Sequence, residues 1–295
     1  MSESLLFPVD RYRIRSATGF KTALLIAILF RASCTSAADL DVERDIAEQI
    51  SARSSPQEVI QLDVSGIPFQ GLYRETTAKE QRGGAIVLHG RHSNQDAAEL
   101  INPLRSELPR HGWSSLSLAL PVPDSEAEAR DFSSLLPESV ARLRSGVLSL
   151  KQRNIANIVL IGQDSGAWVA LSYLLQQPDP AVKAVVLIDP TPTRFLPDFP
   201  VTLEKLAKTR TPILEFLSNR DNPAVADEAR ERRAALKENW EYRQVLINEP
   251  HENWKDLEDY LINRIYGWLA RMKTTVDSMD TKPVNPLQPN EAVSH

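Results

Sequence analysis

A Gly-Gln-Asp-Ser-Gly turn at residues 162–166 is the part of the sequence best suited to chemistry. It follows the apolar run Ile158–Ile161 and leads straight into a segment that favours a helix. Because glycine has no Cβ, Gly162 and Gly166 allow a sharp turn between a strand and a helix. Such a turn projects Asp164 above the sheet, beside the start of the helix. The Asp164 carboxylate is expected there either to react or to cap the helix, since aspartate is a preferred N-cap.

The elements around this turn alternate between strands and helices. Apolar and polar residues alternate over residues 59–75, which predicts two half-buried strands with a turn at Gly66. Later strands are expected at residues 84–89, 113–120, 157–161, 182–188, 212–217 and 242–247. Helices are expected at residues 39–58, 96–110, 137–153, 166–177, 224–240 and 257–272. This order predicts the α/β class, with a doubly wound, mostly parallel sheet flanked by helices.

The turn resembles the nucleophile elbow of the α/β-hydrolase superfamily, which reads Gly-x-nucleophile-x-Gly. Within that superfamily the chain resembles an uncharacterised family of exported bacterial proteins of unknown function. That closer likeness rests on the leader, on Leu88-His89-Gly90 and on the stretch from Gly112 to Pro121. The resemblance implies one α/β-hydrolase-like domain at residues 39–272. The polar, proline-containing residues 273–295 are expected to form a disordered tail.

The segment after the strand at residues 84–89 supplies the second part of the expected site. In α/β-hydrolases the loop after this strand donates one backbone N–H to the oxyanion hole, and the residue after the nucleophile donates the other. His89-Gly90 matches the common His-Gly of that loop. The resemblance therefore assigns one donor to Arg91 or His92 and the other to Ser165. The alternative for His92 is an exposed loop histidine.

Two later segments resemble the parts of the superfamily that carry the acid and the histidine. Asp221 follows one expected strand and His251 follows another, in the family's order of nucleophile, acid and histidine. The gaps are 221 − 164 = 57 and 251 − 221 = 30 residues. The acid fixes the imidazole tautomer, and the imidazole reaches the nucleophile or a water. Asp189 is a second candidate acid, and the alternative for His251 is a surface loop histidine.

The turn departs from the common pattern at its centre, where Asp164 stands in place of serine. Haloalkane dehalogenases and epoxide hydrolases in this superfamily use an aspartate there, but they usually carry a large helical cap. The connection between Asp189 and Pro212 is short and proline-rich, so no large cap domain is expected. The sequence leaves open which of two groups is the nucleophile. Asp164 can attack carbon and form an alkyl-enzyme ester, or Ser165 can act as a displaced serine nucleophile.

Residues 1–38 have the order of a secretory signal peptide. Basic residues precede an apolar run at residues 22–30, and small residues end at Ala37 and Ala38. The run is far shorter than the ~20 residues that span a bilayer. Cleavage after Ala37 or Ala38 and a periplasmic or secreted location are therefore expected, with no stable membrane span afterwards. The alternatives are a buried helix of the domain and a lipoprotein anchored at Cys34.

Composition narrows the function classes. The formal net charge is −5 with both signs scattered, so nothing favours binding to nucleic acid. The histidines are dispersed, and the single cysteine gives no metal-ligand spacing. The chain also lacks the glycine-rich phosphate loops of nucleotide-binding proteins. No metal and no cofactor are expected, the expected partner is a small-molecule substrate or ligand, and the oligomeric state stays open.

Two function classes remain. The first is an exported hydrolase that acts on esters, thioesters, amides or, through Asp164, on an alkylating carbon. The second is a catalytically silent α/β-hydrolase-fold protein that binds a ligand or partner in the cell envelope. Residue 164 is the feature that discriminates between the two classes, since a serine there would have indicated the enzyme. The fold alone does not decide function.

Overall fold

The computed structural model describes residues 38–123, 134–176, 178–190, 203–218, 223–248 and 254–280. By its packing the chain divides between Ser36 and Ala37, and all of the described residues belong to the second unit, Ala37–His295. Residues 1–37 of the expected leader, which include Cys34, lie outside the described residues. Its cleavage and any lipid anchor therefore stay predictions.

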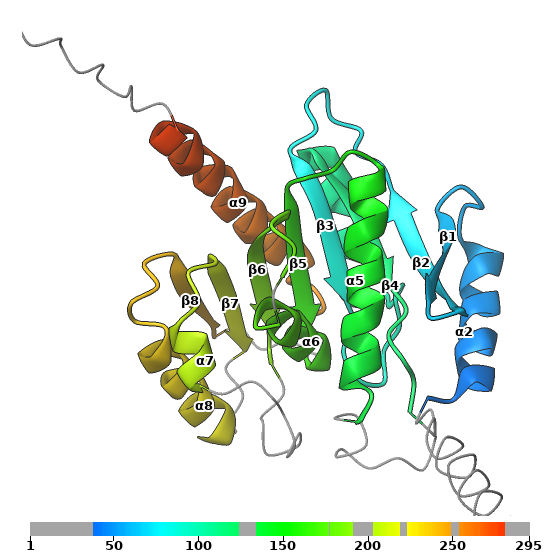
Figure 1. Ribbon diagram of the computed structural model, residues 1–295, viewed down its shortest axis with the longest axis horizontal. Coiled ribbons are helices and arrows are strands. Elements are labelled where there is room, and N and C mark those ends of the chain that lie inside the picture. The colour runs from blue at the N-terminus through cyan, green and yellow to red at the C-terminus, as the bar shows by residue number, and fades with distance from the viewer. Residues whose placement is uncertain are drawn as a thin grey trace, which may run out of the picture. The chain divides into compact units, whose positions relative to one another are not determined.

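Eight strands form one sheet in the order β1-β2-β4-β3-β5-β6-β7-β8 (Figure 1). Their bounds are β1 (Val59–Val64), β2 (Ile67–Arg74), β3 (Gly83–Leu88), β4 (Trp113–Leu118), β5 (Ile158–Gln163), β6 (Val182–Ile188), β7 (Ile213–Ser218) and β8 (Tyr242–Ile247). β2 is antiparallel to both of its neighbours, β1 and β4, and every other neighbouring pair is parallel. The predicted doubly wound, mostly parallel sheet is confirmed.

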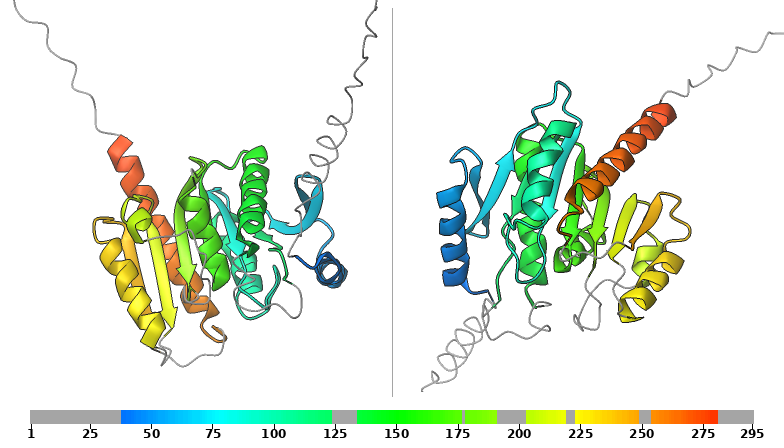
Figure 2. Two further views of the ribbon diagram at one scale, coloured as in Figure 1. Left: turned by 60° about the horizontal axis from the view of Figure 1, so that its bottom comes forward. Right: turned by 180° about the vertical axis from the view of Figure 1, so that it is seen from behind.

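Helices cover both faces of the sheet (Figures 1 and 2). Their bounds are α2 (Leu40–Arg53), α3 (Ile101–Glu107), the 3-10 turn η1 (Leu108–His111), α5 (Leu136–Gln152), α6 (Ser165–Leu174), α7 (Leu203–Ala207), α8 (Pro223–Ala235) and α9 (Glu258–Asp280). α5 and α6 lie on one face, and α3 and α9 lie on the other. Within the described residues, no helix combines the length and apolar character that crossing a membrane requires.

The strand β3 shows why the chain folds into three layers. All of its residues are buried. Ile86 and Leu88 pack into the cluster that includes α5 and α6, whereas Ala85 and Val87 pack into the cluster that includes α3 and α9. Successive side chains of a strand point to opposite faces, so a strand covered on both sides must be apolar throughout. This places the carboxyl end of β3, and the loop that follows, at one edge of a rigid core.

Several predicted helices have different bounds in the structure, among them the helix expected at residues 39–58, which ends at Arg53. The helix expected at residues 96–110 begins only at Ile101, because the Asp96 carboxylate accepts hydrogen bonds from the side chains of Asn102 and Arg105. The helix expected at residues 224–240 ends at Ala235. The helix expected to end at Met272 continues to Asp280, so residues 273–280 are helical rather than part of a disordered tail. Neither proline nor glycine interrupts that stretch.

The connection between β6 and β7 was expected to be short and without a large cap. Its described part contains α7, a helix of 5 residues that the sequence pattern did not predict. Figure 1 shows α7 beside α8, which flanks the β7–β8 end of the sheet.

Candidate active site

The turn between β5 and α6 holds Asp164 in an unusual backbone conformation, with φ 51° and ψ −118°. Aspartate tolerates a positive φ better than most residues do, but this ψ lies outside the left-handed helical region. Such strain costs about 1–3 kcal/mol and tends to be found at functional sites. The backbone N–H of Asp164 donates to the carbonyl of Ile188 in β6 at 2.9 Å, which ties the apex of the turn to the sheet.

Two glycines make the turn possible because the backbone approaches itself closely there. A Cβ on Gly166 would lie 2.5 Å from the carbonyl oxygen of Leu88 and 2.6 Å from that of His89. A Cβ on Gly162 would lie 2.6 Å from the Cα of Ala167. Because these neighbours are backbone atoms, they cannot move aside as a flexible side chain can. The first turn of α6 therefore packs directly on the end of β3.

The Asp164 side chain faces the loop that follows β3. The backbone N–H of Arg91 donates to Asp164 Oδ2 at 3.0 Å, and Arg91 Nε lies 3.3 Å from the same oxygen. The loop is so close that a Cβ on Gly90 would lie 2.7 Å from the Cβ of Asp164. The Asp164 carboxylate makes no capping hydrogen bond to α6. The expectation that Asp164 caps this helix is therefore wrong.

A cavity of about 330 Å³ opens beside Asp164. The described residues that line it include Arg91, His92, Gln163, Asp164, Asp189 and Trp254. Ser165 begins α6 and is not one of the described residues that line this cavity. The structure thus brings together four of the residues predicted for the site, Asp164, Arg91, His92 and the second candidate acid Asp189, and leaves the Ser165 side chain outside the cavity.

His89 positions the loop that carries Arg91. Its ring Nε2 accepts a hydrogen bond from the backbone N–H of Leu120 at 3.0 Å, so Nδ1 carries the proton and donates to the carbonyl of Gly90 at 2.8 Å. Burial, together with the nearby Arg142 cation, lowers the pKa of His89 to about 4, although the bond to Gly90 opposes this shift. A neutral ring with one fixed tautomer therefore ties the loop to the residues that follow β4.

Asp189 is the described carboxylate at the end of β6, and it also lines the cavity. It has a φ of 44°, and its two oxygens accept hydrogen bonds from the backbone N–H and the hydroxyl of Ser218, both at 2.7 Å.

Asp221 and His251 lie outside the described residues, so their expected pairing stays a prediction. The described residues contain no group of three or more His, Cys, Asp or Glu side chains that could hold a metal ion.

Sequence reasoning did not assign the other described residues of this cavity to the site, namely Ser93, Ala97, Glu99, Leu100, Gln163 and Trp254. Gln163 directly precedes the apex of the turn, so its place followed from that of Asp164. Trp254 is fully buried, has a φ of 71° and follows His251 by three residues. Only its nearness to His251 in the sequence could have indicated it.

These features, on this strand order, define an α/β-hydrolase fold. They are the strained apex after β5, the glycines at its close contacts, and the loop after β3 that donates a backbone N–H. The structure is similar to the esterase Pf2001 of Pyrococcus furiosus, with 17% identity, a TM-score of 0.59, and coverage of 74% of this chain and 96% of the esterase. It is similar to Est1E from Butyrivibrio proteoclasticus, with 11% identity, a TM-score of 0.59, and coverage of 74% and 99%. A third similar structure is TT1662 from Thermus thermophilus, with 16% identity, a TM-score of 0.57, and coverage of 72% and 97%. At these identities the likeness shows the fold alone.

A family model matches residues 31–141 and 133–271. The chain therefore belongs to the family described as "Protein of unknown function (DUF3530)". A search of the curated proteins finds no match to the chain.

Proposed function

We propose that this protein is a hydrolase in which the Asp164 carboxylate is the nucleophile. The observation that carries this proposal is the pair of contacts from Arg91, both of which go to Oδ2 of Asp164. In an alkyl ester of Asp164, water adds to the carboxyl carbon, and negative charge develops on the oxygen that is not bonded to the substrate. Donors already aimed at the position of that charge stabilise the transition state without reorganising. Oδ2 is the oxygen that Arg91 holds, so Oδ1 is the attacking atom.

The proposed reaction has two steps. First, Oδ1 forms a bond to a substrate carbon while the bond from that carbon to the leaving group breaks, and the leaving group departs with the electron pair. Next, a water gives a proton to a base and adds to Cγ of the Asp164 ester. The tetrahedral intermediate then collapses, and the substrate leaves as an alcohol that takes up the proton from the base. Asp164 is left as a carboxylic acid that holds one oxygen from water, and it loses its proton to solvent to become a carboxylate again.

His251 is the proposed base for the second step. Its place in the sequence supports this role, because it stands between the end of β8 and Trp254, which lines the cavity. The proposed acid is Asp221, which follows Ser218 at the end of β7. Asp189 is the alternative acid, supported by its place in the cavity wall.

Ser165 has a different proposed role. Its side chain is not part of the described cavity wall, which argues against attack by the serine hydroxyl. Its backbone N–H comes directly after the apex residue, at the start of α6, and a donor at this position suits a second oxyanion contact. Arg91 remains the proposed first donor, and His92, which also lines the cavity, the alternative.

The contact between Arg91 and Asp164 also supports a second function. The Arg91 guanidinium neutralises part of the Asp164 charge, which lowers the reactivity of the carboxylate. In a catalytically silent protein that binds a small ligand in this cavity, this lower reactivity would have no functional cost.

For either function, we propose that the mature chain acts in the periplasm or is secreted. The leader sequence supports this location.

The experiment that separates these functions is a panel of haloalkanes, epoxides, esters and thioesters offered to the wild-type protein. Asp164→Asn keeps the size of the side chain and tolerates a positive φ, so it removes the charge without disturbing the turn. The proposal expects turnover of at least one substrate, its loss in Asp164→Asn and near-normal rates in Ser165→Ala. Full activity in Asp164→Asn contradicts it, and a folded wild-type protein that turns over nothing supports the silent, ligand-binding function.

A further inference from the structure

A second groove, of about 750 Å³, adjoins the candidate active site. Four residues line both the groove and the cavity beside Asp164, and they belong to the segment that follows the Arg91 loop: His92, Ser93, Ala97 and Glu99. The groove and the cavity therefore meet along this segment. The groove wall is mostly polar and includes Arg53, Arg74 and Arg105.

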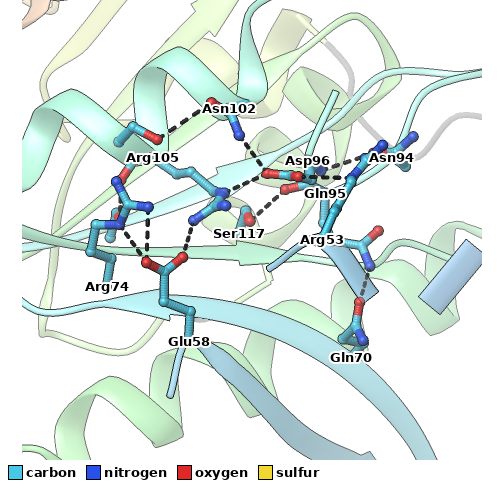
Figure 3. A network of polar contacts seen from close by, with 12 residues as sticks. Arg53, Glu58, Gln70, Arg74, Asn94, Gln95, Asp96, Asn102, Arg105 and Ser117 are labelled. Atoms are coloured by element: carbon cyan, nitrogen blue, oxygen red, sulfur yellow. Dashed lines mark hydrogen bonds and ion pairs between the residues drawn. The ribbon is translucent and has the colours of Figure 1, made fainter. Parts of the chain in front are cut away.

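The three arginines are held by two carboxylates (Figure 3). Glu58 accepts hydrogen bonds from Arg74 at 2.8 Å and from Arg105 at 2.7 Å. Asp96 accepts from Arg105 at 2.7 Å, and Arg53 Nε lies 3.3 Å from its other oxygen. Figure 3 shows these groups as one continuous chain of contacts from Arg74 to Arg53.

The network has more cations than carboxylates. Three guanidinium groups meet Glu58 and Asp96, which leaves one positive charge, and all four carboxylate oxygens already accept a contact. Arg53 keeps donors to spare, because its described contact uses only Nε and its side chain is 56% exposed. A buried ion network is seldom more stable than an apolar replacement, so stability alone does not account for this one. What it does provide is a fixed position for guanidinium donors at a groove wall.

We propose that this groove binds an oxyanion of a small molecule, meaning a carboxylate, phosphate or sulfate group, at its arginine end. Glu99 is exposed at the end shared with the cavity, and its negative charge orients such a molecule with the anion away from Asp164. Part of the inference rests on the proposed function, namely that the bound molecule is the substrate and carries its anionic group apart from the carbon that Asp164 attacks. Binding of the anion does not depend on catalysis.

The test is calorimetric titration of the intact protein with inorganic phosphate and, separately, with succinate, both at constant ionic strength. Arg53→Gln is expected to weaken binding roughly fivefold, the size of effect expected for a partly exposed charge. Glu99→Gln is expected to tighten it roughly twofold, because it removes a nearby negative charge. Arg44→Gln is the matched control, since Arg44 lies on the same helix, is 61% exposed and pairs with Asp41 outside the groove. It should leave binding unchanged.

Three outcomes overturn the inference. The first is no binding of either anion by the wild-type protein. Another is equal weakening by Arg53→Gln and Arg44→Gln, which indicates unspecific attraction to positive charge. The third comes from vesicles of phosphatidylglycerol and phosphatidylcholine. If these retain the wild-type protein but not Arg53→Gln, while free phosphate does not bind, the groove takes a lipid headgroup. Anion binding without turnover of any substrate leaves the groove assignment intact and removes only the proposed hydrolase function.

Discussion

The backbone N–H of Arg91 donates to Oδ2 of Asp164 at 3.0 Å, which joins the loop after β3 to the apex of the turn after β5. The same residue brings its guanidinium to the same oxygen. One residue therefore supplies both a neutral donor and a charged donor to one carboxylate oxygen. Substitution of Arg91 by any residue except proline keeps the backbone donor but removes the charged donor, so the two contributions can be measured apart.

Arg91→Ala is expected to slow hydrolysis of the alkyl-enzyme by roughly 10- to 100-fold, since the guanidinium no longer stabilises the oxyanion while the backbone N–H remains. Pre-steady-state measurement of the covalent intermediate should show it accumulating. Arg110→Ala, which removes a 70% exposed guanidinium on η1, is the control and should leave the rate unchanged. Faster turnover in Arg91→Ala contradicts the proposed role and means that the cation only restrains the nucleophile.

Gly166→Ala is expected to destabilise the fold by about 2–3 kcal/mol, because the added Cβ meets the backbone at the end of β3. Gly267→Ala is the matched control, since the nearest atom to a Cβ there is Arg271 Nη1, at 3.8 Å. Within α9, alanine should instead stabilise by about 0.5–1 kcal/mol. Chemical denaturation of both variants measures the difference, and equal stabilities would show that α6 does not pack on β3 as described.

Much of the fold was predictable because the pattern of apolar residues records it directly. The bounds of β6 and β8 match the predicted strands, since continuous or alternating apolar residues between turn signals allow few other structures. The bounds of α3 were less predictable. Asp96 begins a stretch of helical periodicity, but its carboxylate forms an ion pair with the distant Arg53 and a second one with Arg105, nine residues later. No local pattern contains those contacts.

The candidate site was predictable only in part. Glycine spacing indicated the turn and placed Asp164 at its apex, because a backbone approach of this kind excludes a Cβ. Spacing did not indicate which way the carboxylate turns. That depends on the loop of Arg91, which stands 73 residues earlier in the chain and meets Asp164 only through the pairing of β3 with β5.

Stability should depend on pH through His89. Its pKa is about 4 in the folded protein, against 6.5 for an ordinary histidine side chain, so between these pH values the unfolded chain binds a proton that the folded chain does not. The neutral His89 ring therefore contributes about 3 kcal/mol to the free energy of unfolding. This contribution is complete above pH 6.5 and is lost as the pH falls towards 4. His89→Gln cannot titrate. The stability advantage of wild type over His89→Gln should therefore shrink by about 2 kcal/mol between pH 7 and pH 4.5, and a constant difference contradicts the buried, neutral ring.

The mature protein is expected to lack residues 1–37 or 1–38, because the leader ends in small residues that suit cleavage after Ala37 or Ala38. Intact-mass spectrometry of protein purified from cells that export it measures this directly. A chain that starts at Cys34 with the added mass of a lipid supports the lipoprotein alternative. An intact N-terminus beginning at Met1 contradicts export.

The reacting atom itself can be identified by trapping. In His251→Ala the proposed base is absent, so an alkyl-enzyme ester should form and persist when a substrate found in the panel is added. Peptide mass spectrometry of the trapped protein then locates the added mass. The account predicts one alkyl group, on Asp164, and none in the double variant Asp164→Asn, His251→Ala. Added mass on Ser165, or none on a folded His251→Ala protein whose wild type turns over the same substrate, contradicts Asp164 as the nucleophile.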